Sequence, residues 1–124
     1  MDRFYFDHNA TTPVSPEVLE ALSGVLAEVY GNASSIHHYG QAAKKGLEQA
    51  RREVAALLNA DPDEIVFVSG GTEADNLAVL GAVRASGKPR KHVVTTAIEH
   101  PAVLNACAQL EREGVEVSYA APDQ

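Results

Sequence analysis

The spacing of apolar residues predicts two amphipathic helices in the first half of the chain. Ser15 followed by Pro16 marks a helix start, because serine caps helix N-termini and proline is tolerated in the first turn. Apolar residues then recur at helical spacing until Gly31. The segment 31–40 is polar and bounded by glycines, which predicts a loop. A second helix is expected over about 40–59, where apolar residues again share one side.

In the second half of the chain, short apolar runs alternate with helical segments. The runs 65–68 and 92–96 are too short for helices and rich in β-branched residues, as expected of buried strands. A third strand is predicted over 115–119. Helices are predicted over 72–85 and over 101–113. The alternation of strand and helix predicts an α/β fold with a mostly parallel sheet.

Two regions are expected from this order of elements. Residues 1–40 form an N-terminal arm, a helix and a loop, and residues 41–124 form the first part of a larger domain. The three predicted strands leave an apolar sheet edge without a partner, which favours an incomplete domain. The alternative is a small three-layer domain closed by the two N-terminal helices.

Charge and composition exclude several classes of function. The chain has 124 residues, 17 acidic and 10 basic, and a formal net charge of −7, which argues against a nucleic-acid partner. No apolar run approaches the roughly 20 residues of a membrane-spanning helix, and no secretory leader pattern is present. A single cysteine forms no internal disulfide, and no pair of histidines has metal-binding helical spacing. We therefore expect a cytoplasmic protein that binds neither membranes nor metal.

The segment with the clearest chemistry joins the run 65–68 to a helix and reads SGGTEADN (69–76). The first N–H groups of a helix are unpaired, and the positive end of its dipole points outward. Two glycines allow an anion to approach the backbone closely, and Thr72 adds a hydroxyl donor, so the segment predicts a phosphate cup. A tight turn with Thr72 as the helix N-cap explains the same residues equally well. Neither a Walker loop nor a dinucleotide fingerprint is present.

A histidine follows the next predicted strand. Glu99, His100 and Pro101 come directly after the run 92–96, and ligands of α/β sheets gather beyond the carboxyl ends of the strands. Alone, such a histidine usually caps a helix. Opposite a phosphate cup, a cofactor contact becomes the favoured interpretation of His100.

Four motifs together resemble a known family. DHNATTP (7–13), GNASSIH (31–37), SGGTEADN (69–76) and EHPAV (99–103) occur in this order and at comparable spacing in cysteine desulfurases of the NifS/IscS type. These enzymes belong to the class V aminotransferase group of fold-type I pyridoxal-phosphate enzymes. The resemblance covers essentially the whole chain but only about the first third of the family's length.

The resemblance implies a role for several residues. Gly71 and Thr72 match the pair that holds the phosphate of pyridoxal 5′-phosphate. His100 matches the histidine that stacks on the pyridine ring and serves in proton transfer. The remaining matches lie close to the substrate: Asn9, Ala10, Thr11, Asn32 and His37. The implied activity converts L-cysteine to L-alanine and an enzyme-bound persulfide, in a homodimer that supplies sulfur to an iron–sulfur scaffold or another acceptor.

Two groups that the family needs have no match among these residues. None of the lysines matches the Schiff-base lysine motif, and Cys107 does not match the catalytic cysteine, since it lies mid-helix between alanines like a packing residue. We therefore expect these residues by themselves to be inactive. Two alternatives remain: part of another class V aminotransferase, or a non-catalytic phosphate-binding α/β module.

Overall fold

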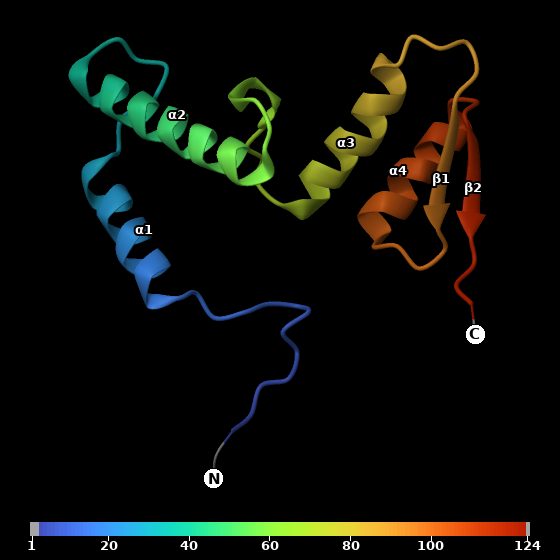
Figure 1. Ribbon diagram of the computed structural model, residues 1–124, viewed down its shortest axis with the longest axis horizontal. Helices are drawn as coiled ribbons and strands as arrows, with labels where there is room; N and C mark the ends of the chain where they lie inside the picture. The colour runs from blue at the N-terminus through green and yellow to red at the C-terminus, as the bar shows by residue number, and fades with distance from the viewer. Residues whose placement is uncertain (1–2, 124) are drawn as a thin grey trace. The chain divides into compact units, whose positions relative to one another are not determined.

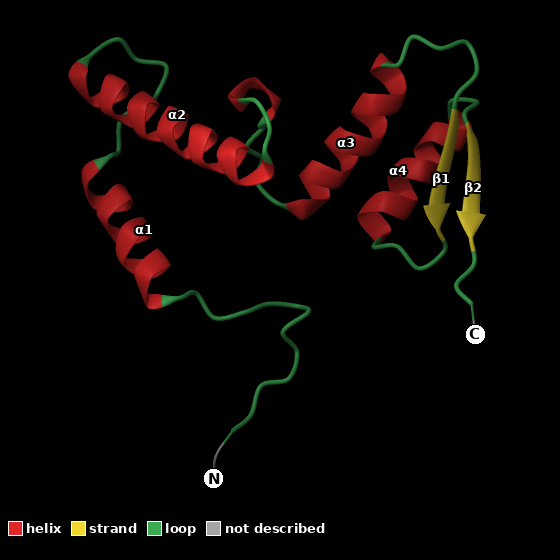
Figure 2. Cartoon of the chain, in the orientation of Figure 1, coloured by secondary structure: helices red, strands yellow, loops and turns green. Residues whose placement is uncertain are grey.

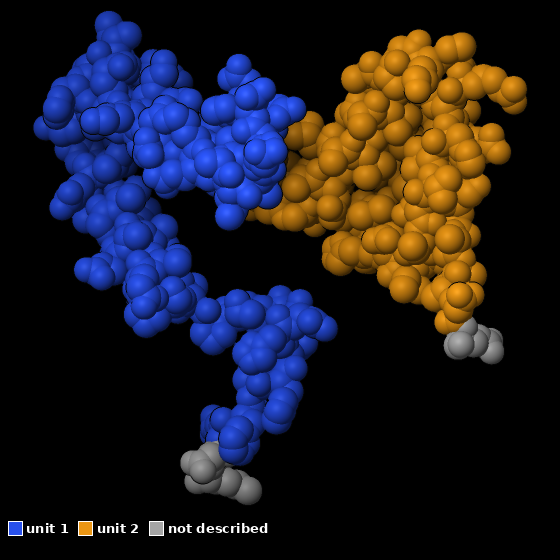
Figure 3. Space-filling model, in the orientation of Figure 1, with its two compact units in different colours: residues 1–65 blue, residues 66–124 orange. Residues whose placement is uncertain are grey.

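The computed structural model describes residues 3–123 and divides into two compact units, residues 1–65 and 66–124 (Figure 3). Each unit is described here by itself. The regions 1–40 and 41–124 were predicted from the sequence, whereas the two units are defined by contacts within this chain. That boundary therefore stays a prediction.

The first unit is helical (Figure 1). It contains α1 (Pro16–Glu28), α2 (His38–Leu58) and the short 3₁₀ helix η1 (Pro62–Glu64). The expected start of α1 is confirmed, because the Ser15 hydroxyl oxygen accepts a hydrogen bond of 3.4 Å from the Val18 N–H. Both helices lie within two or three residues of the bounds that the apolar spacing predicts.

The second unit is an α/β arrangement, which confirms the predicted fold class (Figure 2). It contains α3 (Gly71–Ala85), β1 (His92–Thr96), α4 (Pro101–Arg112) and β2 (Glu116–Ala120). The two strands pair in parallel, with α4 as the crossover between them. Parallel strands need such a crossover, because a tight turn cannot return the chain to the same end of the sheet.

The strand predicted over 65–68 is wrong for the residues that the structure describes. Ile65 has an extended backbone (φ −90°, ψ 123°), but the sheet of residues 3–123 contains only β1 and β2. A guanidinium N–H of Arg51 donates to the Ile65 carbonyl oxygen, an acceptor that a neighbouring strand would otherwise use. β-Branched residues favour an extended backbone, but a strand also needs a partner for its hydrogen bonds.

The core of the second unit lies along one face of α4. Its buried side chains recur at helical spacing and belong to Ala102, Ala106, Cys107 and Leu110. Cys107 and Leu110 are fully buried. Such spacing places the four side chains on one side of the helix, which confirms that Cys107 is a packing residue.

Helices α3 and α4 pack against each other and run in the same direction (Figure 1). Arg84 in the last turn of α3 forms an ion pair with Glu113, the C-cap of α4, so the C-terminal ends are adjacent. The N-terminal ends of both helices consequently lie at the other end of the unit, where β1 ends. This arrangement brings the segments around Thr72 and His100 to the same end, although residues 65–68 form no strand.

Candidate active site: two helix N-termini

The N-terminus of α3 presents unpaired backbone donors. The first hydrogen bond of the helical ladder runs from the Ala74 N–H to the Gly70 carbonyl oxygen at 3.1 Å. The N–H groups of Gly71, Thr72 and Glu73 therefore precede the ladder, as the first donors of every helix do. Apart from its chain neighbours and the backbone of α3 itself, a methyl group on Gly70 or Gly71 would meet no described atom within 4 Å. The space beside these donors is open to a ligand.

Thr72 is not the helix N-cap. The N-cap of α3 is Gly70, no side chain makes a capping hydrogen bond there, and Thr72 is the second residue of the helix. The structure thus removes the simpler explanation of the motif, in which the threonine hydroxyl serves only to cap the helix. Thr72 is exposed in the first turn of α3, and the donation of its hydroxyl to a bound anion stays a prediction.

The side chains of Glu73 and Asn76 brace this turn. The Glu73 carboxylate accepts hydrogen bonds from the backbone N–H and the hydroxyl of Ser69, at 2.8 and 2.5 Å. These bonds, the hydroxyl first, lower the pKa of Glu73 below its ordinary value. The Asn76 amide donates to the Thr72 carbonyl oxygen at 2.8 Å, so Asn76 supports the turn within its own helix. Glutamate at the third helical position often accepts a hydrogen bond from the backbone at the helix start. The sequence therefore contained a signal for the contact of Glu73 with Ser69.

His100 occupies the N-cap of α4, as expected. Its Nδ1 accepts a hydrogen bond of 3.1 Å from the Ala102 N–H, so this ring nitrogen is engaged in capping the helix. An accepting Nδ1 carries no proton, which assigns the proton of a neutral ring to Nε2. His100 is exposed, so the part of its ring that does not cap α4 can meet a ligand.

The loop before His100 is held at both ends. The Ala97 N–H donates to the Ala120 carbonyl oxygen at 2.9 Å, which ties the end of β1 to β2. The Thr96 hydroxyl donates to the Glu99 carboxylate at 2.8 Å. These contacts fix the path of the backbone from β1 to α4, and they therefore position the backbone of His100.

The other predicted site residues lie in the first unit. Asn9 and Ala10 belong to an exposed turn, in which the Ala10 and Thr11 N–H groups donate to the Asp7 carbonyl oxygen at 3.1 and 3.4 Å. Asn9, Ala10 and Thr11 belong to the first unit and His100 belongs to the second. A site that they share therefore stays a prediction.

Asn32 and His37 shape the loop between α1 and α2. The Asn32 side-chain oxygen accepts from the Ser34 N–H at 2.9 Å, and His37 caps α2 by accepting from the Gly40 N–H at 3.3 Å. A side chain on Gly40 would come within 2.4 Å of the Ser35 carbonyl oxygen, so only glycine fits there. These contacts stabilise the loop, and the place of both residues near substrate stays a prediction.

Comparisons with known proteins agree on one family. The profile of the family described as Aminotransferase class-V matches residues 4–124. The chain is 52% identical over 119 residues to the cysteine desulfurase of Trichormus azollae. The alignment covers 96% of this chain and 30% of that protein. The chain is 50% identical over 122 residues to the cysteine desulfurase IscS of Shewanella sediminis, with the same two coverages.

Solved structures give the same result. The structure of a NifS-like protein superposes on this chain with a TM-score of 0.87 at 40% sequence identity. The superposition covers 95% of this chain and 32% of the NifS-like chain. SspA in complex with cysteine has a TM-score of 0.84 at 39% identity, covering 96% and 34%. This chain belongs to the class V aminotransferase family. It spans about 30% of the length of the curated relatives named above.

The resemblance to cysteine desulfurases inferred from four motifs is thereby confirmed. Within residues 3–123 no helix has the length and apolar character needed to cross a membrane. The same described range holds no cluster of three or more potential metal ligands.

Cys107 is expected to be inert in the folded chain. Its side chain is fully buried, and burial, followed by the nearby carboxylates of Glu111 and Glu99, raises the pKa of the thiol. Since thiolates are the reactive form, iodoacetamide should label the native chain at least about 100-fold more slowly than the urea-unfolded chain. Mass spectrometry measures the labelling directly, and a Cys107→Ala variant is the unlabelled control. Equal rates in the two states would show that Cys107 is accessible.

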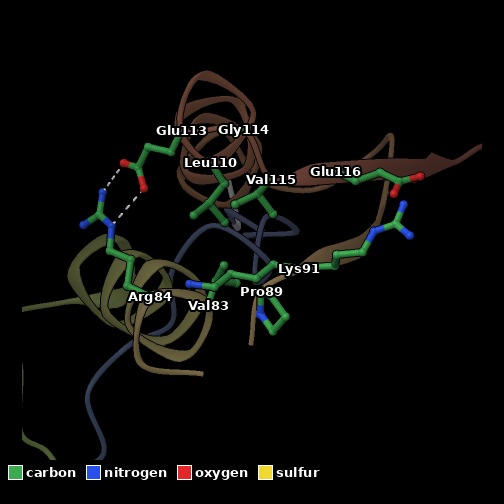
Figure 4. Close-up of a pocket in the computed structure, with 10 residues that line it drawn as sticks. Val83, Arg84, Pro89, Lys91, Leu110, Glu113, Gly114, Val115 and Glu116 are labelled. Atoms are coloured by element: carbon green, nitrogen blue, oxygen red, sulfur yellow. Dashed lines mark hydrogen bonds and ion pairs between the residues drawn. The ribbon is translucent and has the colours of Figure 1, made fainter. Parts of the chain in front are cut away.

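A cavity of about 400 Å³ lies at the opposite end of the second unit, beside the C-terminal ends of α3 and α4 (Figure 4). Arg84 and Glu113 face each other there and form two hydrogen bonds, one of them 3.2 Å from the arginine Nε to the carboxylate. Arg84, followed by Gln109, lowers the pKa of Glu113 to about 2, and the charge of Lys91 acts in the same direction. The pair joins α3, whose first turn contains Thr72, to α4, whose N-cap is His100.

Acid should weaken this link. A carboxylate whose pKa is depressed in the folded state stabilises that state above its unfolded pKa and loses the effect as the pH falls toward its folded pKa. The chain should therefore have a slightly higher Tm than a Glu113→Gln variant at neutral pH, because a partly exposed pair contributes little. The difference should shrink between about pH 5 and about pH 2. A difference that is independent of pH in thermal unfolding would contradict this assignment.

Proposed function

We propose that this chain supplies the phosphate-binding part of a pyridoxal-phosphate-dependent cysteine desulfurase. The observation that carries the proposal is the open, uncapped N-terminus of α3, which lies at the same end of the unit as His100. It occurs in a chain whose relatives are named cysteine desulfurases.

The residues at this end fit the cofactor's chemistry. The N–H groups of Gly71 and Thr72, with the Thr72 hydroxyl, suit a phosphate dianion because the helix dipole also favours negative charge there. The exposed ring of His100 suits a flat aromatic partner. Pyridoxal phosphate, when bound, supplies an electron sink for the substrate's reacting carbon. The protein's part is to fix its position and to move protons near that carbon.

In the overall reaction the C–S bond of L-cysteine breaks, and the sulfur passes to a thiol of the enzyme as a persulfide while L-alanine leaves. We propose that Asn9, Ala10, Thr11, Asn32 and His37 lie near the substrate. The full-length protein is proposed to be a cytoplasmic homodimer that delivers sulfur to an iron–sulfur scaffold or another acceptor. Cys107 does not provide the thiol, because it is buried in α4.

The test is a comparison of two proteins. The full-length protein with pyridoxal phosphate and L-cysteine should release alanine and accumulate persulfide in equal amounts before an added reductant discharges the sulfur. Residues 1–124 alone should release no alanine, since no lysine here matches the lysine that bonds to the cofactor. Alanine production by the 124-residue chain would overturn the second expectation.

Another class V aminotransferase would behave differently. Such an enzyme would transfer the amino group of an amino acid to a keto acid, with no persulfide and no need of a thiol. Blocking the thiols of the full-length protein should therefore abolish the reaction proposed here. If turnover of an amino acid survives complete blocking of the thiols, the desulfurase assignment is rejected, whereas the assignment to the class V family still holds.

A further inference from the structure

The side chain of Glu73 reaches back across the first turn of α3 to the residue that precedes the two glycines. One carboxylate oxygen accepts from both the backbone N–H and the hydroxyl of Ser69. A carboxylate that accepts two hydrogen bonds from one residue restricts both that residue's backbone and its side chain. Ser69 is consequently tied to the helix that follows it.

The turn 69–72 is held from its other end as well. The Ala74 N–H donates to the Gly70 carbonyl oxygen, and the Asn76 amide donates to the Thr72 carbonyl oxygen. The two glycines between these anchors lack side chains, and the positions beside them are open. Glycine has the greatest backbone freedom of all residues, so an unanchored turn of this composition would sample many shapes.

We propose that Glu73 is a positioning residue that holds the turn 69–72 in the shape in which Gly71 and Thr72 receive a phosphate group. This inference rests on the function proposed above. It also assigns the donors. Both donors of Ser69 are taken by Glu73, so the phosphate is received by the groups that follow Gly70 and not by Ser69.

The charge of Glu73 has two opposite effects. A carboxylate in the first turn of a helix is favourable with the helix dipole, but it repels a phosphate bound at the same N-terminus. The hydrogen bonds from Ser69 lower the pKa of Glu73, so the group is ionised at neutral pH. If the contact matters through its geometry, an uncharged acceptor of the same length should replace it. Glu73→Gln therefore separates positioning from charge.

The experiment measures two quantities in the full-length protein. Amide hydrogen exchange without cofactor reports how ordered the turn is. The Kd of pyridoxal phosphate reports how well Gly71 and Thr72 bind the phosphate group. In Glu73→Ala the amides of Ser69 and Ala74, which are hydrogen-bonded at this turn, should exchange about fivefold faster, the effect expected for a lost helix cap. The substitution should also raise the Kd of pyridoxal phosphate by about fivefold to tenfold. Glu73→Gln should restore both values to those of the parent.

Asp75→Ala is the matched control, because it removes a carboxylate from the same end of α3 without touching Ser69. It should leave the exchange of the Ser69 and Ala74 amides unchanged. Unchanged exchange in Glu73→Ala would overturn the proposal, and so would a Glu73→Gln variant as defective as Glu73→Ala. If the parent protein does not bind pyridoxal phosphate, the proposed function fails, whereas the exchange measurement still decides whether Glu73 orders the turn.

Discussion

In the full-length enzyme, replacing His100 by alanine should lower turnover of L-cysteine by about 10²–10⁴-fold, the usual contribution of a general acid or base. It should also weaken the binding of pyridoxal phosphate. The ring of His100 is exposed at the N-terminus of α4, where it can stack on the cofactor. Because Nδ1 is taken by the Ala102 N–H, Nε2 is the nitrogen left to exchange a proton.

Capping must be separated from these roles, because alanine also removes the N-cap of α4 at a cost of about 1 kcal/mol. His100→Asn keeps a good capping side chain and removes the ring, so it should lose turnover and cofactor affinity without losing stability. His100→Phe keeps a ring for stacking and removes the proton. It should retain the cofactor and lose turnover. Steady-state kinetics, cofactor titration and thermal unfolding of the three variants give the required readouts.

The variants distinguish three roles of His100: capping, stacking and proton transfer. If His100→Asn binds pyridoxal phosphate and turns over like the parent, His100 is only a helix cap. If His100→Phe retains turnover as well as cofactor, stacking alone explains the residue and its proton is not used.

Replacing Thr72 by valine should weaken pyridoxal phosphate binding by about one to two orders of magnitude, the value of a hydrogen bond to a charged group. Valine has the shape of threonine but no hydroxyl donor. The N-cap of α3 is Gly70, so the change removes no helix cap, and Tm without cofactor should stay close to that of the parent. A loss of affinity would then report the contact with phosphate.

Thr72→Ser is the control, because it keeps the hydroxyl and should retain most of the affinity. Titration of the apoenzyme with pyridoxal phosphate, followed by absorbance, measures both variants. An unchanged affinity in Thr72→Val would show that backbone N–H groups alone hold the phosphate.

Local signals in the sequence were sufficient for most of the secondary structure. Ser15 and Pro16 placed the start of α1, and the β-branched run 92–96 placed β1 at its observed bounds. Pro101 placed the start of α4 with His100 as its N-cap. These features depend on contacts within a few residues, such as a side chain that accepts from a nearby N–H, and the local sequence determines such contacts.

The sequence also indicated a candidate site, whose binding of phosphate stays a prediction. The motif 69–76 indicated an anion-binding helix N-terminus, and four motifs in order indicated the family, which the comparisons confirm. The sequence left open whether Thr72 caps its helix. The structure decided this by placing Gly70 at the N-cap, because the backbone conformation at one residue selects where a helix begins.

Features that join distant residues were decided by the tertiary structure alone. Residues 65–68 have the composition of a strand, but a strand forms only where a neighbour supplies its hydrogen bonds, and β1 pairs with β2 instead. Arg84 and Glu113 lie 29 residues apart and meet because α3 and α4 pack in parallel. By itself the sequence determined the approximate bounds of the helices and the start of α1 and α4, and it indicated the residues proposed to bind phosphate. Packing determined that the two helix N-termini lie at one end of the second unit, because only contacts between distant segments fix the direction of one helix relative to another.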